Sequence, residues 1–262
     1  MKLMPKDEDD NISLKLTKKI KISDDTYIFR FSFDDESSTL GLPIGNHVVF
    51  SAKIGGELEC RKYTPISMVQ QTGHVDFLIK VYYPNVHPKF PEGGKMTLHC
   101  DRMNIGDSML MEGPKGKLAY EGHGNFRITK KDVKGKTKIG CIAGGTGITP
   151  CYQVIQAALK NNDGTSLSLI FGNRTTSDIL LKDELLQFKN NYKDRFKLYL
   201  TVDVKPDDKE NWQQGVGFIT QEMLKANLPP PSPETLITYC GPPPFEKMMK
   251  EHLKALGYDE TM

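Results

Sequence analysis

The sequence has little surplus charge of either sign. It has 35 Lys and Arg residues and 33 Asp and Glu residues, which gives a net charge of +2 at pH 7. Proteins that bind nucleic acid or a membrane surface through a broad electrostatic field carry a marked basic excess. The near balance argues against both roles for the molecule as a whole, so any basic partner site must be local.

Cysteine is scarce as well. The five cysteines are an odd number, are spread thinly, and include no CxxC pair. This pattern does not suit a disulfide framework or a zinc site, and it fits a reducing compartment. We therefore expect an intracellular, cytoplasmic protein without a metal site.

Long hydrophobic runs are missing. A membrane helix needs about 18 or more consecutive apolar residues, and no window of the sequence approaches that length. The amino end, MKLMPKDEDDN (1–11), has no apolar signal-peptide core, and Lys2 excludes N-myristoylation. We expect no membrane segment in this chain.

The segments that are present change in character near residue 128. Before it, short alternating or apolar stretches rich in β-branched and aromatic residues are separated by Gly- and Pro-rich breaks. These stretches are TYIFRFSF (26–33), HVVFSAKI (47–54), VDFLIKVYY (75–83) and SMLMEGPKGKLAY (108–120). Many short strands with almost no helical pattern predict an antiparallel β-barrel or sandwich over residues 10–127.

The stretch ITKKDVKGKTK (128–138) is polar and lysine-rich, and we interpret it as a linker. The pattern of apolar residues is different after it. Over residues 139–262, an apolar strand pattern leads into an amphipathic helix four times. The four units begin at IGCIAGG (139–145), SLSLIFGN (166–173), FKLYLTVD (196–203) and TLITYCG (235–241). The repetition predicts a doubly wound parallel sheet, so the expected fold class is a β-barrel followed by an α/β domain.

Two strand-to-helix turns of the α/β region carry unusual residues. Ligands of open α/β sheets bind beyond the carboxyl ends of the strands. GGTGITP (144–150) lets the backbone approach a pyrophosphate at a helix N-terminus, but a merely tight connection is equally compatible with it. CGPPPF (240–245) forms a rigid loop that places Cys240 at the same edge, although a buried structural cysteine is the simpler interpretation of Cys240 alone.

Six motifs in a fixed order give a specific resemblance. They are PIGNHV (43–48), RKYTPIS (61–67), IKVYYPNVHPKFPEGGKMT (79–97), IAGGTGITP (142–150), FGNRTTSDILLKDEL (171–185) and CGPPPF (240–245). With this order and spacing, from residue 12 to residue 258, the sequence resembles NADH–cytochrome b5 reductase and the flavin domain of eukaryotic nitrate reductase. The resemblance implies an FAD-binding barrel followed by an NADH-binding domain, as in the ferredoxin reductase superfamily, with the active site between them.

The resemblance implies a flavin site on the first domain. Arg61 would pair with the FAD pyrophosphate, Tyr63 would pack against the flavin and ribityl region, and Thr64 would hydrogen-bond near flavin N5. His47 would support Thr64 and relay a proton, although a histidine on a strand is more often structural. The other residues implied to bind FAD are Lys62, Leu78, Lys80, Tyr82, Tyr83, Met96, Thr97 and, from the second domain, Thr149.

An NADH groove is implied on the second domain, with Cys240 beside the nicotinamide. With His47 and Thr64, Cys240 completes the implied catalytic residues. The other residues implied to bind the nucleotide are Gly144, Gly145, Thr146, Gly147, Pro150, Gly241, Pro242 and Phe245.

Three features depart from the family pattern. Lys62 stands where a small residue or proline is usual, and Gln213 stands where an acid is thought to favour NADH over NADPH. Family members also continue past the equivalent of GYDETM (257–262) into a last apolar strand. Arg174 is the one candidate partner for an NADPH phosphate. We therefore expect NADH to be preferred over NADPH, but by a smaller margin than with an acid at position 213.

The implied function is hydride transfer from NADH to FAD, followed by transfer of single electrons to cytochrome b5 or another b5-type haem protein. Two alternatives stay open. One is the flavin domain of a nitrate reductase, whose acceptor is also a b5-type haem, and the other is a non-catalytic, nucleotide-responsive module of the same fold. We expect a monomer, in the cytoplasm or at a membrane surface that it reaches through its acceptor.

Overall fold

A computed structural model describes residues 2–3, 11–86 and 91–259 of the chain. The chain forms two compact units, Met1–Ala119 and Tyr120–Met262. The segment HPKF (87–90), part of one sequence motif, lies outside the described residues. In the part of the chain that is described, no helix is both long enough and apolar enough to cross a membrane. The boundaries expected from sequence, 10–127, 128–138 and 139–262, stay predictions.

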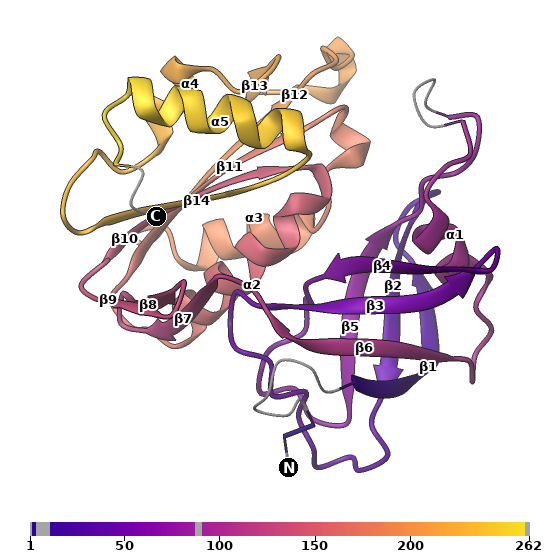
Figure 1. Cartoon of the computed structure of the whole chain (residues 1–262). Coiled ribbons are helices and arrows are strands. Elements are labelled where there is room, and N and C mark those ends of the chain that lie inside the picture. Colours follow the sequence, from indigo (N-terminus) through magenta and orange to yellow (C-terminus); the bar gives the residue numbers. More distant parts are fainter. Residues whose placement is uncertain (1, 4–10, 87–90, 260–262) are drawn as a thin grey trace. The chain divides into compact units, whose positions relative to one another are not determined.

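The first unit is built around six antiparallel strands. They are β1 (Asn11–Lys21), β2 (Thr26–Ser32), β3 (His47–Ile54), β4 (Glu57–Tyr63), β5 (His74–Lys80) and β6 (Ser108–Lys115). They form one curled sheet in the order β4-β3-β6-β1-β2-β5, with β4 and β5 at its edges (Figure 1). The predicted antiparallel β-domain is confirmed, in the form of a half-barrel.

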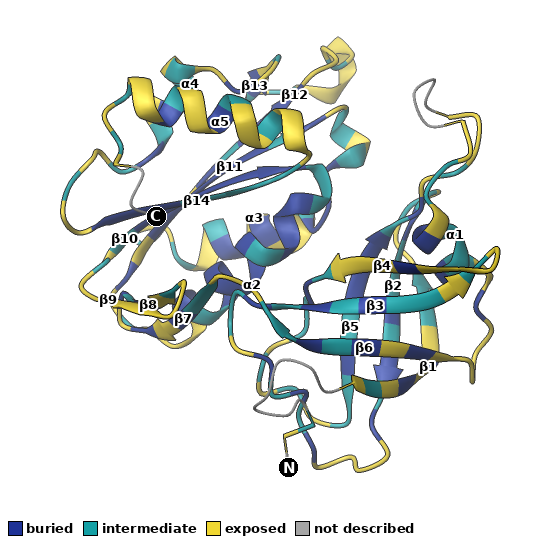
Figure 2. Ribbon diagram, in the orientation of Figure 1, coloured by how far each residue is buried: buried dark blue, intermediate teal, exposed yellow. Residues whose placement is uncertain are grey.

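Alternation of apolar residues explains why these segments form a sheet around a core. Phe29 and Phe31 of β2 are fully buried and are separated by one residue, so both side chains point to the same face. On that face the rings of Phe50 and Phe77 lie 4.8 Å apart between centroids in an edge-to-face arrangement. Buried positions recur along all the strands of the sheet (Figure 2).

Helix α1 (Lys95–Arg102) of the first unit is not indicated by the sequence pattern. Two glycines precede it. A β-carbon on Gly93 would lie 2.4 Å from the carbonyl oxygen of Tyr82, and one on Gly94 would lie 2.5 Å from Oγ1 of Thr97. Gly93 also has a φ of 72°, which favours glycine. Only glycines let the chain pass so close to Tyr82 before the helix begins.

A small sheet lies at the start of the second unit. Its strands are β7 (Leu118–Gly122), β8 (Asn125–Ile128) and β9 (Lys131–Val133), in that order. The hydroxyl of Tyr120 donates a hydrogen bond to the buried carboxylate of Asp163, which also accepts bonds from the N–H groups of His123 (3.1 Å) and Thr165 (3.0 Å). These bonds tie the small sheet to the rest of the unit.

The main sheet of the second unit has five parallel strands in the order β13-β12-β11-β10-β14. They are β10 (Lys138–Gly144), β11 (Ser166–Asn173), β12 (Phe196–Val202), β13 (Gly215–Val216) and β14 (Thr235–Cys240). The helices are α2 (Ile148–Lys160), α3 (Lys182–Asn191), α4 (Gln221–Asn227) and α5 (Pro243–Ala255).

The helices cover both faces of this sheet. Helices α4 and α5 lie on one face, and α2 and α3 lie on the other (Figure 1). Ile142, Ile170 and Ile237 from three neighbouring strands form a buried cluster with Leu224 of α4 and Met249 of α5. The predicted doubly wound parallel sheet is therefore confirmed. Its strand order reverses at β10, because β11 lies on one side and β14 on the other.

Candidate functional site

The edge strand β4 and the residue after it carry four of the predicted flavin residues. Successive residues of a strand point to opposite faces. Arg61 and Tyr63 belong to the face where the Tyr63 ring packs on Phe50, with centroids 4.5 Å apart, and Lys62 and Thr64 belong to the other. Burial raises the pKa of Tyr63, so its hydroxyl stays protonated. A ligand that lies along this edge of the sheet can reach both groups of side chains.

A shared carboxylate brings two cations together at this edge. Glu59 is 8% exposed, and its Oε2 lies 2.9 Å from Nη2 of Arg61 while its Oε1 lies 2.7 Å from Nζ of Lys95. Lys95 also reaches the exposed Glu57 at 3.4 Å. Lys95 and then Arg61 lower the pKa of Glu59, so this carboxylate is ionised at neutral pH. Sequence reasoning missed Glu59, although its position two residues before Arg61 on one strand was a usable signal.

The amino end of α1 lies beside these cations, because Lys95 is its first residue. The first N–H groups of a helix have no partner within it and attract anions. The hydroxyl of Thr97 donates to the carbonyl of Gly94 (3.0 Å) and accepts from the N–H of Tyr82 (3.2 Å), whereas Met96 is buried in the core. Thr97 therefore fixes the turn, and the backbone of the turn with its cations is suited to a phosphate group.

His47 is the first residue of β3, and Thr64 directly follows β4. Val48 pairs with Tyr63, so the antiparallel register places His47 opposite Thr64. Thr64 is 9% exposed, and its hydroxyl has no hydrogen-bond partner among the described residues. Burial and then the charge of Lys62 lower the pKa of His47, so the imidazole is neutral at neutral pH. A neutral imidazole has one donor and one acceptor nitrogen, as a proton relay needs.

Three predicted residues at or beyond β5 have other partners in the structure or are buried. Nζ of Lys80 lies 2.8 Å from Oδ2 of Asp25. The hydroxyl of Tyr83 donates to Oδ2 of Asp101 at 3.2 Å. Leu78 is buried, whereas the side chain of Tyr82 is half exposed. Contacts of these side chains with FAD stay predictions.

In the second unit, the two motif turns meet at the carboxyl ends of β10 and β14. A β-carbon on Gly147 would lie 2.2 Å from the carbonyl oxygen of Cys240. Gly144 and Gly241 both face the ring of Phe245, which β-carbons there would approach to 3.0 Å and 2.5 Å. Gly147 therefore has no room for a β-carbon, and a β-carbon on Gly241 or Gly144 would require the Phe245 ring to move. The contact forms where the strand order reverses, which is the usual ligand position of such sheets.

The glycine turn leads directly into α2. Gly145 has a φ of 52° and begins a 3-10 turn that ends at Gly147. The hydroxyl of Thr149 donates to the carbonyl of Thr146 at 3.3 Å. Pro150 lies in the first turn of α2, where a missing N–H costs no hydrogen bond. The turn therefore brings backbone N–H groups to the amino end of a helix, as an anion site requires.

Cys240 ends β14 and is partly buried. Burial, and then the charge of Glu246, raise the pKa of the thiol to about 11. The side chain is thus a neutral thiol at physiological pH and is a poor nucleophile. Pro242 caps the amino end of α5, and the next two prolines form its first turn. These prolines make the loop after Cys240 rigid.

Three further polar residues lie next to strands of the main sheet: Arg174 follows β11, Asp203 follows β12, and Gln213 lies just before β13. Gln213 donates to Oδ1 of Asn211 at 3.1 Å and stays on the surface. Asp203 follows β12, and its N–H donates to the carbonyl of Asn173 at 2.9 Å. Burial raises the pKa of Asp203, and the charge of Arg174 partly offsets this shift. Sequence reasoning missed that a carboxylate accompanies Arg174.

Asn173 is a second residue that sequence reasoning missed. It is 5% exposed, and within the described part of the chain neither the nitrogen nor the oxygen of its side-chain amide has a hydrogen-bond partner. A buried polar group without a partner costs about 1–3 kcal/mol, so such groups call for an explanation. The residue ends β11, next to the strand that feeds the glycine turn. The motif FGNRT contained it, but no sequence signal separated it from its neighbours.

Comparisons with known proteins agree on the family. A family model described as "Oxidoreductase FAD-binding domain" matches residues 13–120, and one described as "Oxidoreductase NAD-binding domain" matches residues 141–251. NADH-cytochrome b5 reductase 2 of Xenopus tropicalis is 46% identical over 256 residues, covering 95% of this chain and 83% of that protein. NADH-cytochrome b5 reductase 3 of Rattus norvegicus is 48% identical over 238 residues, covering 88% and 78%.

A solved structure extends the agreement to the fold. The cytochrome b5 reductase domain of Ulva prolifera nitrate reductase matches with a TM-score of 0.93 and 36% identity, covering all of this chain and 98% of that one. The protein is thus an oxidoreductase with an FAD-binding and an NAD-binding domain, and the sequence resemblance is confirmed. The chain belongs to the NADH-cytochrome b5 reductase family.

Proposed function

We propose that the protein passes a hydride from NADH to FAD and then single electrons to cytochrome b5. The observation that carries the proposal is the group of Arg61, Lys95 and the amino end of α1, joined through Glu59. A guanidinium fork, an ammonium and helix N–H groups together suit the diphosphate of a dinucleotide. The family relationship identifies that dinucleotide as FAD.

The side chains around β4 fit this cofactor. Bound FAD supplies an acceptor for two electrons that can release them one at a time. Tyr63 offers a ring face beside Arg61 on the same strand, and Thr64 offers a hydroxyl without a partner among the described residues. His47 lies opposite Thr64 and is neutral, so it is able to hold or accept a proton there. We assign Arg61 to binding, Tyr63 to packing and Thr64 with His47 to proton positioning.

The second unit fits NADH at the turn formed by Gly144–Gly147 and Cys240–Gly241. Gly147 and Gly241 let the two turns pack against the Cys240 backbone and the Phe245 ring, and a β-carbon on Gly145 would meet no atom within 4 Å, so a nucleotide can approach the backbone there closely. Phe245 supports the turn, and the neutral thiol of Cys240 aligns the nicotinamide without reacting with it. Correct alignment of a hydride donor lowers the barrier, because the reacting atoms start close together.

Cytochrome b5 is the proposed acceptor because the relatives with similar length carry it in their names. A role as the reductase domain of a nitrate reductase is the second candidate, and the match to the Ulva prolifera domain favours it. We further propose that the protein acts as a cytoplasmic monomer. The sparse, unpaired cysteines support the compartment.

The spectrum of the purified protein tests the function. We expect a yellow protein whose flavin absorbance is bleached by NADH without oxygen and restored by oxidised cytochrome b5. Ferricyanide reduction by NADH measures the first half-reaction alone. A protein that stays colourless after FAD is added would contradict the FAD assignment, and one that binds FAD but is not bleached by NADH would be the non-catalytic module. Rapid bleaching by NADH with no reduction of cytochrome b5 would support the hydride transfer to FAD but would contradict cytochrome b5 as the acceptor.

A further inference from the structure

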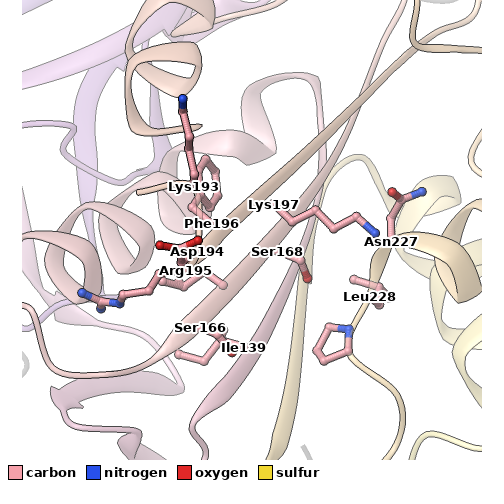
Figure 3. Close-up of a pocket in the computed structure, with 12 residues that line it drawn as sticks. Ile139, Ser166, Ser168, Lys193, Asp194, Arg195, Phe196, Lys197, Asn227 and Leu228 are labelled. Carbon is pink, nitrogen blue, oxygen red and sulfur yellow. The ribbon is translucent and has the colours of Figure 1, made fainter. Parts of the chain in front are cut away.

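A hollow at the amino ends of β10, β11 and β12 is lined by Ser168 and Lys197 (Figure 3). The hydroxyl of Ser168 is enclosed, and Ile237 and Leu228 fill the space beside Gly140, so a ligand in the hollow would not reach this hydroxyl. Charged groups that a ligand can reach lie together elsewhere, on β4 and at the start of α1 in the first unit.

Glu59 holds the two cations of the proposed FAD site. Its Oε2 lies 2.9 Å from Nη2 of Arg61, and its Oε1 lies 2.7 Å from Nζ of Lys95. The side chains of Arg61 and Lys95 are 54% and 53% exposed, so both are open to a ligand, whereas Glu59 is buried. A phosphate that reaches either cation therefore finds Glu59 already bound to it.

Both cations also have other acceptors. Nη1 of Arg61 donates to the carbonyl of Cys60 at 2.8 Å, so both terminal nitrogens of the guanidinium have a partner within the protein. Nζ of Lys95 also lies 3.4 Å from Oε2 of Glu57, so two of its three donors face carboxylates. A guanidinium binds phosphate best through two parallel N–H bonds, and each of its two forks uses Nη2. A diphosphate must therefore share Nη2 of Arg61 with Glu59 or displace Glu59 from it.

The charges of this group cancel. Arg61 and Lys95 contribute two positive charges, and Glu57 and Glu59 contribute two negative ones. Lys95 and then Arg61 lower the pKa of Glu59, so Glu59 is ionised at neutral pH. Glu57 is exposed and can turn into water, but Glu59 is buried beside the cations and keeps its charge there. A diphosphate at this place is therefore repelled by a carboxylate while the cations attract it.

We propose that Glu59 competes with the FAD diphosphate for Arg61 and Lys95 and so weakens FAD binding. This role rests on the proposed function, which places the FAD diphosphate at these cations. In the free protein Glu59 neutralises both cations, and the diphosphate displaces it when FAD binds. A carboxylate that instead served to aim the cations at FAD would make the affinity fall when it is removed. The two roles therefore give opposite signs for Glu59→Gln, which removes the charge and nearly preserves the shape.

The FAD affinity of the holoenzyme decides between these signs. Dilution releases FAD, and the change in flavin fluorescence gives the Kd of each protein. We expect Glu59→Gln to lower the Kd by about threefold to tenfold, and Glu57→Gln to lower it by less than about twofold, because Glu57 is exposed and lies 3.4 Å from Lys95. Glu36→Gln is the matched control, since Glu36 is an exposed glutamate whose backbone lies beside Gly73, and it should leave the Kd unchanged. FAD binding with an equal or higher Kd in Glu59→Gln would overturn the role of Glu59 alone, whereas a wild-type protein that never binds FAD would overturn the proposed function as well.

Two further measurements test the same competition. Because the four charges cancel, the Kd of the wild type for FAD should rise by less than about threefold between about 50 mM and about 500 mM salt, and a larger rise would overturn the charge balance on which the role depends. This measurement does not require Glu59→Gln to fold. In a double-variant cycle, Glu59→Gln should strengthen FAD binding less in an Arg61→Ala background than in the wild type, because one of the two contested cations is gone. An equal gain in both backgrounds would show general charge repulsion and refute competition for Arg61.

Discussion

Gly147 touches the backbone of Cys240 so closely that a β-carbon on Gly147 would lie 2.2 Å from the Cys240 carbonyl oxygen. The two residues are 93 positions apart in the chain, and each belongs to a motif that stands out separately in the sequence. Their contact makes one site of the turn after β10 and the turn after β14. The nucleotide site proposed for the second unit therefore depends on the absence of a side chain at Gly147.

Replacing Gly147 by alanine should separate the two turns. Overpacking costs about 1–3 kcal/mol when neighbours are forced apart, and the loss should fall on nucleotide binding because backbone lies on both sides of the contact. We expect the KM for NADH to rise about tenfold or more, while FAD content stays at the wild-type level. Gly172→Ala is the matched control, because a β-carbon there would meet Ile219 at an ordinary 3.4 Å. Steady-state ferricyanide reduction measures both variants, and equal KM values would refute the close contact.

Replacing Cys240 should affect the rate of hydride transfer and spare flavin binding. Because the thiol is neutral, with a pKa of about 11, we expect it to act by aligning the nicotinamide. We expect Cys240→Ser to slow flavin reduction by about tenfold, which corresponds to about 1.4 kcal/mol of transition-state stabilisation. Stopped-flow reduction of enzyme-bound FAD at saturating NADH is the measurement. A wild-type rate in Cys240→Ser would remove Cys240 from the site.

Arg61 should be required for FAD affinity through its fork of donors. Hydrogen bonds to charged groups contribute about 1.5–3 kcal/mol, so Arg61→Ala should weaken FAD binding by about tenfold to a hundredfold. Arg61→Lys should recover only part of the loss, because an ammonium does not bind two oxygens in a fixed fork. Lys53→Met, an exposed lysine on the neighbouring strand β3, controls for loss of a positive charge. Fluorescence titration of the apoprotein with FAD decides, and an Arg61→Ala affinity equal to that of Lys53→Met would contradict the assignment.

His47 should have a pKa below the usual histidine value of 6.5 in the folded protein, because burial and then the charge of Lys62 disfavour its protonated form. As the pH falls below 6.5, the unfolded state binds the proton first, so folding stability falls until the folded pKa is reached. Lys62→Met should raise the His47 pKa and reduce that loss. NMR titration of the imidazole in both proteins measures the shift, and a higher pKa in the wild type than in Lys62→Met would reverse the sign argued here.

The alternation of strands and helices in the second unit could be predicted from the sequence, because the spacing of apolar residues changes from a strand pattern to a helix pattern where each helix begins. The residues of β4 could be predicted only through the family resemblance, since Arg61 and Thr64 have no periodic signal of their own. Helix α1 was not predicted, because only three of its eight residues, Met96, Thr97 and Cys100, are buried and the helix therefore has no long apolar pattern. Asp25, Glu59 and Asp101, the partners of Lys80, Arg61 and Tyr83, were not identified, because tertiary ion pairs and hydrogen bonds leave no pattern in one sequence.

We expect the nucleotide preference to depend on Arg174 after β11, Asp203 after β12 and Gln213 before β13. NADPH carries an extra phosphate, and a nearby carboxylate repels it whereas an arginine attracts it. Asp203 accompanies Arg174, and their opposite charges offset one another, so the Arg174 charge is less effective on a phosphate than it would be alone. We therefore expect the wild type to prefer NADH, and Gln213→Asp to widen the preference by raising the KM for NADPH. Asp203→Asn should narrow it by severalfold, because Arg174 then faces the phosphate without a competing charge. Steady-state kinetics with both nucleotides measure kcat/KM for each variant. A wild-type enzyme that is more efficient with NADPH would show that another group sets the preference. An Asp203→Asn variant whose ratio of kcat/KM for NADH to kcat/KM for NADPH is unchanged would show the same.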